Sequence, residues 1–124
     1  MSIPSDLRYS RDHEWVRIDG NRAFIGVTDF AQHQLGDIVF VELPVVGQEV
    51  ALGDSFAVIE SVKAAADIYA PLSGTIVDIN GTLEESPESV NKDPYGSWVI
   101  VLELSVPEQI NKLLTAEQYE SLAQ

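Results

Sequence analysis

Lys63 is one of three lysines in a chain of 124 residues, and its surroundings distinguish it from an ordinary surface lysine. The segment Glu60–Asp67 places three alanines directly after it and an acidic residue at each end. Strand-like runs at 56–59 and 67–70 flank this segment, which predicts a β-hairpin with Lys63 at its tip. Taken alone, an exposed lysine is most often a solvated surface residue. A lysine that carries a covalent group must, however, be exposed, rigidly anchored and uncrowded, and such a tip would meet all three conditions.

The rest of the sequence predicts a mostly β protein. Apolar and polar residues alternate over short runs, and turn residues such as Asp19-Gly20-Asn21 separate them, a pattern typical of β-hairpins. Frequent turns between short strands favour a flattened barrel-sandwich of two antiparallel sheets. The predicted strands cover residues 15–18, 23–27, 37–43, 56–59, 67–70, 75–79 and 98–104.

Two helical segments are predicted beside the sheets. Thr28 is a suitable N-cap for a short helix over 29–35, and Gly36 is placed to end it. Beyond residue 104 the periodicity changes, and a C-terminal helical segment is predicted over about 107–123, with a capping box that begins at Thr115. The apolar residues expected to dock this segment against the sheets are Leu113, Leu114, Tyr119 and Leu122.

The chain is expected to form a single domain over residues 1–124, because no linker interrupts it. The core is predicted at about 9–104, and residues 81–97 form its least regular stretch. With 20 acidic and 7 basic residues, the net charge is −13, which disfavours binding to nucleic acids and anionic membranes. No apolar run approaches the ~20 residues that cross a bilayer, and no leader is evident. A cytoplasmic protein is therefore expected, or a mitochondrial one if this is a processed eukaryotic chain.

Little catalytic chemistry is evident. The chain contains no cysteine, which excludes disulfides, thiolate zinc sites and a cysteine nucleophile. His13 and His33 are the only histidines, and no further ligands at regular spacing accompany them, so no metal site is predicted. His13-Glu14 could form an acid–base pair, but no nucleophile accompanies it. We therefore expect no catalytic residues and a structural role for both histidines.

The lysine segment closely resembles a known family. Residues 56–74 are similar to the lipoylation segment of the glycine cleavage system H protein family. Four further blocks resemble that family in the same order, and the match runs from about Tyr9 to Leu104. Several ordered blocks at family-like spacing make the resemblance far more specific than one short motif. These blocks are His13–Val16, Ile25–Gln32, Leu35–Pro44 and Val90–Trp98.

The resemblance implies a carrier rather than an enzyme. Lipoate would be joined to Lys63 Nζ by an amide and would shuttle the aminomethyl group of glycine. The implied partners are the glycine decarboxylase (P protein), the aminomethyltransferase (T protein), the dihydrolipoyl dehydrogenase (L protein) and a lipoate-attaching enzyme, and a monomer is expected. The sulfur chemistry would belong to the cofactor, so a chain without cysteine could take part in redox transfer.

Acidic residues near the hairpin are candidates for a second site. In the resembled family, the loaded arm is thought to fold back into a cleft on the body. Its ammonium would need carboxylates or carbonyls as partners there. Glu14 and Asp67 match the family's motif and are the first candidates, and Asp12 and Glu60 come next. The alternative is that all four are ordinary surface acids.

Other functions remain open at the level of sequence. A biotinyl domain would flank its lysine with methionines, whereas Val62 and Ala64 stand there. A lipoyl domain of a 2-oxoacid dehydrogenase usually has an acid before the lysine and belongs to a longer chain. An enzyme with Lys63 as a Schiff-base nucleophile would need a desolvated lysine, which a hairpin tip does not provide. A lipoate relay or storage carrier is a further possible role.

Overall fold

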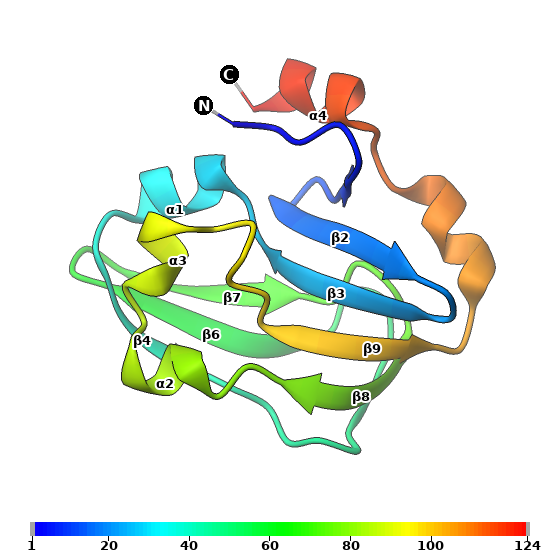
Figure 1. Ribbon diagram of the computed structural model, residues 1–124, viewed down its shortest axis with the longest axis horizontal. Coiled ribbons are helices and arrows are strands. Elements are labelled where there is room, and N and C mark those ends of the chain that lie inside the picture. The colour runs from blue at the N-terminus through cyan, green and yellow to red at the C-terminus, as the bar shows by residue number, and fades with distance from the viewer. Residues whose placement is uncertain (1, 124) are drawn as a thin grey trace.

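The computed structural model describes residues 2–123 and contains two antiparallel β-sheets packed face to face (Figure 1). The larger sheet has the order β1-β2-β3-β9-β8-β5, and the smaller one has the order β4-β6-β7. Among the described strands no ladder joins the two sheets, so the fold is a sandwich of two antiparallel sheets, as predicted. The strands are β1 (Arg8–Tyr9), β2 (Glu14–Asp19), β3 (Arg22–Val27), β4 (Ile38–Glu42), β5 (Glu49–Val50), β6 (Ser55–Ser61), β7 (Ala65–Tyr69), β8 (Gly74–Ile79) and β9 (Ile100–Leu104).

The helices lie at the ends and edges of the sandwich (Figure 1). The predicted helix over 29–35 is confirmed as α1 (Asp29–Leu35), with Thr28 accepting a hydrogen bond from the amide of Ala31 and Gly36 ending the helix. The predicted capping box is also confirmed, at the start of α4 (Ala116–Leu122). The stretch over 81–97, predicted as irregular, contains two one-turn helices, and the segment after β9 begins as a 3₁₀ helix. These elements are α2 (Thr82–Glu85), α3 (Ser89–Lys92) and η1 (Pro107–Lys112).

Apolar side chains from the inner faces of both sheets form the main core. Val16, Ile25 and Leu102 come from the larger sheet, and Ile59 and Ile68 come from the smaller one; all five are at most 2% exposed. Burial of this apolar surface supplies the main driving force for folding. The core therefore holds β6 and β7, which carry the lysine hairpin, against β2 and β3.

A second apolar cluster lies where the C-terminal helix meets the larger sheet. Its buried members are Leu7, Tyr9, Trp15 and Tyr119. Of the residues expected to dock the C-terminal segment, Leu113 and Tyr119 are buried and Leu114 is partly buried.

The expectation for Leu122 is wrong, because its side chain is 41% exposed. Ala116, Tyr119 and Ala123 form the apolar stripe of α4 that contacts the cluster. Leu122 lies beyond the edge of that stripe, which follows from the 3.6-residue period of the helix.

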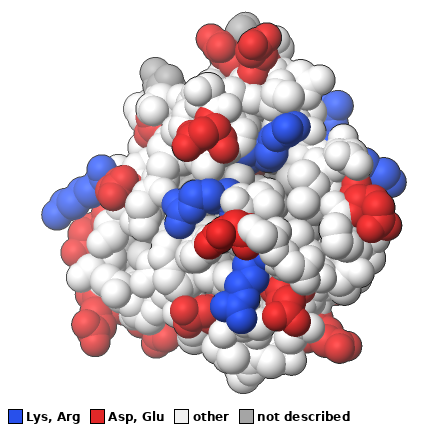
Figure 2. Space-filling view, turned by 45° about the vertical axis from the view of Figure 1, so that its right-hand side comes forward, with Lys and Arg blue, Asp and Glu red and all other residues white. Residues whose placement is uncertain are grey.

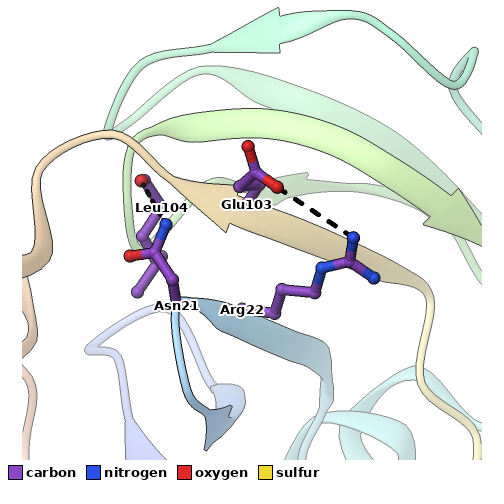
Figure 3. Close-up of polar contacts among 4 residues, drawn as sticks. All are labelled: Asn21, Arg22, Glu103 and Leu104. Atoms are coloured by element: carbon purple, nitrogen blue, oxygen red, sulfur yellow. Dashed lines mark hydrogen bonds and ion pairs between the residues drawn. The ribbon is translucent and has the colours of Figure 1, made fainter.

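The β2–β3 hairpin turns at Gly20 and Asn21, as predicted. Gly20 has φ +62°, the conformation of a glycine at the first central position of a type II′ turn. Beside the turn, Asn21 Nδ2 donates to the carbonyl of Leu104 at 3.3 Å, and Arg22 pairs with Glu103 at 4.0 Å (Figure 3). Both charged side chains are more than half exposed, so this ion pair contributes little stability. It does mark the register that places β3 beside β9.

The surface carries the large acidic excess of the chain. Figure 2 shows one face of the molecule, where acidic and basic side chains lie interspersed. The acidic residues visible on this face therefore do not merge into one continuous patch. Within residues 2–123, no helix is long and apolar enough to cross a membrane.

Candidate functional site

Lys63 lies at the tip of the β6–β7 hairpin, as the sequence predicts. Val62, Lys63 and Ala64 connect the two strands, and all three are exposed. Ser61 closes the turn, because its amide donates to the carbonyl of Ala64 at 2.8 Å. The Ser61 hydroxyl oxygen also accepts from the amides of Lys63 and Ala64 at 3.2 and 3.1 Å. The backbone on both sides of the lysine is therefore held in place while its side chain remains accessible.

The turn between α1 and β4 supports the hairpin from the side. The carbonyl of Asp37 accepts a hydrogen bond from the amide of Val62 at 3.0 Å. Gly36, with φ +79°, lies against the lysine side chain: a Cβ built on this glycine would lie 3.1 Å from Cε of Lys63. A glycine thus allows the chain both to end α1 and to pass directly beside Lys63.

Asn91, in α3, fixes this turn, and sequence reasoning gave it no role. Its Nδ2 donates to the carbonyl of Gly36 at 2.8 Å and to Gln32 Oε1 at 2.9 Å, and its Oδ1 accepts from the amide of Ile38 at 2.9 Å. The side chain therefore satisfies backbone groups on both sides of the turn that touches Lys63. A lone asparagine in an irregular stretch carries no sequence signal for such a role.

An open cleft of roughly 420 Å³ lies beside the hairpin, between α1, the start of β2 and the strands β6 and β7. Apolar residues form most of its walls, and Asp12, Glu14 and Asp67 are its acidic residues. The structure therefore brings together Glu14 and Asp67, which are 53 residues apart in sequence, in one cleft. The full lining is Asp12, His13, Glu14, Val27, Phe30, Ala31, Gln34, Leu35, Ile59, Ala66, Asp67 and Ile68.

Glu60, a further sequence candidate, is not among the lining residues. It is exposed on β6, next to Ile59, which does line the cleft. Because side chains alternate along a strand, Glu60 points to the opposite side of the sheet. Of the four acidic candidates, Asp12, Glu14 and Asp67 line the cleft and Glu60 does not.

Glu14 is the buried acid of the cleft, with 2% of its surface exposed. Ser10 Oγ donates to Oε1 at 2.5 Å, and the amide of Tyr69 donates to Oε2 at 3.3 Å. Burial raises the pKa of Glu14 and the nearby charge of Asp12 adds to the rise, whereas these two hydrogen bonds lower it; the net result is a pKa of about 7. This carboxyl group can therefore be neutral or ionised near pH 7, and a cation in the cleft would favour the ionised form.

Asp67 differs from Glu14 in its exposure to solvent. It is exposed on β7 and accepts one hydrogen bond, from Ser55 Oγ to Oδ1 at 2.9 Å. Its backbone pairs with Val58 of β6, so the same hairpin that bears Lys63 also positions this acid. Glu14 and Asp67 therefore line the cleft as one buried and one exposed acidic residue.

In the described part of the chain, the two histidines do not form a metal site or an acid–base pair with a nucleophile, and His13 is held by contacts within the protein. Its backbone has φ +67°, and its Nδ1 lies 2.8 Å from the hydroxyl of Tyr119. Burial lowers its pKa, and the charge of Asp12 opposes that shift. His33 lies exposed in the last turn of α1. No group of three or more potential metal-ligating side chains occurs within residues 2–123.

The glycine cleavage H-protein family model matches residues 7–124 of this chain. The chain belongs to this family. The glycine cleavage system H protein of Carboxydothermus hydrogenoformans is 57% identical over 121 residues, which is 97% of this chain and 93% of that protein. The H protein of Bacillus subtilis is 55% identical over 125 residues, covering 100% of this chain and 98% of that one.

The fold agrees with the family. The crystal structure of a glycine cleavage system H protein from Mycobacterium marinum matches with a TM-score of 0.88 and 38% identity, over 96% of this chain and 97% of that one. Both the predicted family and the predicted fold class are therefore confirmed. The chain is a carrier protein of the glycine cleavage system and not a catalyst, which decides against the biotinyl, dehydrogenase-domain and Schiff-base alternatives.

Proposed function

We propose that Lys63 carries lipoate through an amide on Nζ, and that the adjacent cleft receives the loaded arm. The observation that carries this proposal is that one hairpin provides both features. Lys63 lies at its tip, and Ala66, Asp67 and Ile68 of the same hairpin line the cleft. Asp67 is four residues from the lysine, at most roughly 13 Å along an extended strand. An extended lipoyl-lysine, with about eleven bonds to its ring, spans roughly 14 Å.

The side chains present fit such an arm. Phe30, Leu35 and Ile59 give the cleft apolar walls that would shelter a hydrocarbon chain with a sulfur ring. The cargo, an aminomethyl group, is cationic and would need a carboxylate partner on leaving water. Glu14 and Asp67, which line the cleft, would accept hydrogen bonds from it. Lipoate supplies the thiol chemistry, and this chain would hold the arm and restrict access of water.

The exposed tip also suits a carrier that must visit several enzymes. We propose as partners the glycine decarboxylase, the aminomethyltransferase, the dihydrolipoyl dehydrogenase and a lipoate-attaching enzyme. Membership of the glycine cleavage H-protein family supports partners within this system. Because Ser61 and Asp37 anchor the backbone beside Lys63, each enzyme would meet the same rigid tip and a mobile side chain.

Attachment is tested by the mass of the intact protein, isolated from a host that supplies lipoate. The parent should carry one lipoyl group, and Lys63→Arg should fold but carry none. Lys92→Arg and Lys112→Arg are matched controls, since they change the other two lysines, both exposed, and should leave lipoylation intact. Peptide mapping that placed the lipoyl group on Lys92 or Lys112 would refute the proposal, as would a biotinyl group on Lys63.

The cleft is tested by the stability of the cargo. Lipoylated protein is loaded by the decarboxylase with glycine, and spontaneous loss of the aminomethyl group is followed after the enzyme is removed. Glu14→Gln and Asp67→Asn should accelerate that loss, by roughly tenfold or more for a charge-assisted hydrogen bond. Glu60→Gln removes a charge from the same hairpin outside the cleft and should decay like the parent. Equal decay of all four proteins would show that the cleft does not hold the cargo.

A further inference from the structure

Tyr119 links the C-terminal helix to the cleft through a buried hydroxyl group. Its side chain is fully buried, and its hydroxyl lies 2.7 Å from Thr28 Oγ1 and 2.8 Å from His13 Nδ1. The three residues come from segments far apart in sequence. The hydroxyl is therefore the point where α4 joins two other parts of the structure.

Those two parts both line the cleft. His13 lines the cleft and directly precedes Glu14, the buried acid. Thr28 is the N-cap of α1, and Phe30, Ala31, Gln34 and Leu35 of that helix form another wall of the cleft. The amide of Thr28 also donates to the carbonyl of His13 at 3.0 Å. The ring centroids of His13 and Phe30 lie 4.6 Å apart. Tyr119 thus bridges the two walls at the point where they come together.

The hydrogen bonds can be assigned in one consistent direction. Burial lowers the pKa of His13 and favours a neutral ring, so Nδ1 can accept from the hydroxyl of Tyr119. The hydroxyl of Thr28 can then donate to Tyr119, while its oxygen accepts from the amide of Ala31 at 3.2 Å. Each hydroxyl donates once and accepts once, so the whole chain of bonds is satisfied without water.

A helix as short as α1 depends on such contacts. With seven residues it would not be stable in isolation, so its cap and its tertiary neighbours determine where it lies. Tyr119 holds the residue that caps it. The contact therefore acts on the whole α1 wall of the cleft rather than on a single side chain.

We propose that Tyr119 is a positioning residue for the carrier function, and that α4 holds the walls of the cleft in place around the loaded arm through the His13–Tyr119–Thr28 hydrogen bonds. This inference rests on the proposed function, because it assumes that the cleft retains the aminomethyl cargo. Tyr119 does not line the cleft, so it acts through α1 and His13.

The test compares Tyr119→Phe with Tyr9→Phe in the full-length lipoylated protein. The two rings stack with centroids 4.6 Å apart and an interplanar angle of 8°, so removing either hydroxyl leaves the aromatic packing in place. The hydroxyl of Tyr9 donates to the carbonyl of Pro4 at 2.5 Å, in the N-terminal segment and away from the cleft. Tyr9→Phe is therefore a control for the loss of one buried hydroxyl in the same cluster.

Two measurements are made on each variant. In the unloaded protein, hydrogen exchange at the amides of Thr28 and Ala31 should rise in Tyr119→Phe and remain at the parental level in Tyr9→Phe. In the loaded protein, the aminomethyl group should be lost roughly two- to tenfold faster in Tyr119→Phe, the range for loss of one neutral hydrogen bond. Tyr9→Phe should decay like the parent.

The outcomes separate this inference from the proposed function. If Glu14→Gln accelerates the loss of cargo and Tyr119→Phe does not, the cleft holds the cargo and the inference is wrong. If neither variant accelerates it, the arm cleft itself is wrong and the inference fails with it. Equal acceleration in Tyr9→Phe and Tyr119→Phe would assign the effect to general loosening of the cluster and would also overturn the inference.

Discussion

The aliphatic end of Lys63 lies against Gly36, with 3.1 Å between Cε and the position that a Cβ on this glycine would take. The contact joins the proposed attachment site to the C-terminal end of α1, the helix that forms one wall of the cleft. A carrier of this kind needs a mobile arm on a fixed base. The Gly36 contact, together with the hydrogen bond from Val62 to Asp37, provides that base.

Gly36→Ala should disturb the lysine as well as the backbone. Gly36 has φ +79° and ψ −155°, a region that is essentially restricted to glycine, so alanine should cost on the order of 1–3 kcal/mol of stability. The new methyl group should also displace the Lys63 side chain, and lipoylation should slow several-fold. Initial rates of lipoyl transfer and urea unfolding measure the two effects.

The control for this substitution is Gly53→Ala. Gly53 also has a positive φ, +93°, but, apart from its own chain neighbours, no residue has a heavy atom within 4 Å of the position of its Cβ. This variant should lose stability while being lipoylated at the parental rate. If both variants were lipoylated equally fast, the contact between Gly36 and Lys63 would have no effect on modification.

Asn91→Ala should destabilise the protein through the turn beside Lys63. The substitution removes three hydrogen bonds, to Gln32, Gly36 and Ile38, and should cost roughly 2–4 kcal/mol. Asn111→Ala, at an exposed position in η1, should change the free energy of unfolding by less than about 0.5 kcal/mol. Urea denaturation distinguishes the two. A loss at Asn91 no larger than that at Asn111 would show that the turn does not need these bonds.

Much of the fold could be predicted because its signals are local. Thr28 and Gly36 cap the two ends of α1, and the capping box at Thr115 marks the start of α4; each signal depends on residues a few positions apart. The elements that were missed are very short. β5 has two residues and α2 has four, too few to show a period.

The site could be predicted only in part, because its geometry depends on long-range pairing. Glu14 and Asp67 were nominated through a family resemblance, and the structure places both in one cleft. Glu60 does not line the cleft because it alternates with Ile59 along β6, and only the Ile59 side of that strand borders the cleft. The roles of Asn91 and Tyr119 depend on contacts 53 to 106 residues away along the chain, so no local pattern could reveal them.

The pKa of Glu14 should make stability depend on pH. Its pKa rises from 4.5 to about 7 on folding, so the native state binds a proton more tightly than the unfolded chain. The contribution of this group to stability is then fully present below about pH 4.5 and is lost as the pH rises through 7. Over that window the loss is on the order of 3 kcal/mol.

Glu14→Gln should remove this dependence. Relative to the parent, the variant should gain stability steadily between pH 5 and pH 8, as measured by urea unfolding at several pH values. Glu60→Gln, at an exposed position, should follow the pH profile of the parent. A constant difference between the parent and Glu14→Gln across this range would mean that Glu14 does not titrate there.

Retention of the cargo should depend on pH in the opposite direction. Asp12, His13, Glu14 and Asp67 line the cleft, and a protonated Glu14 cannot form an ion pair with an ammonium group. Because a cation favours the ionised carboxylate, the loaded state should shift the titration of Glu14 below pH 7. The decay rate of Glu14→Gln divided by that of the parent should therefore be large at pH 8 and approach one as the pH falls below 6.

His13 and the intrinsic chemistry of the arm are common to both proteins, so the ratio of the two decay rates isolates the effect of Glu14. A ratio that stayed the same from pH 8 to pH 6 would show that the charge of this buried acid does not hold the cargo.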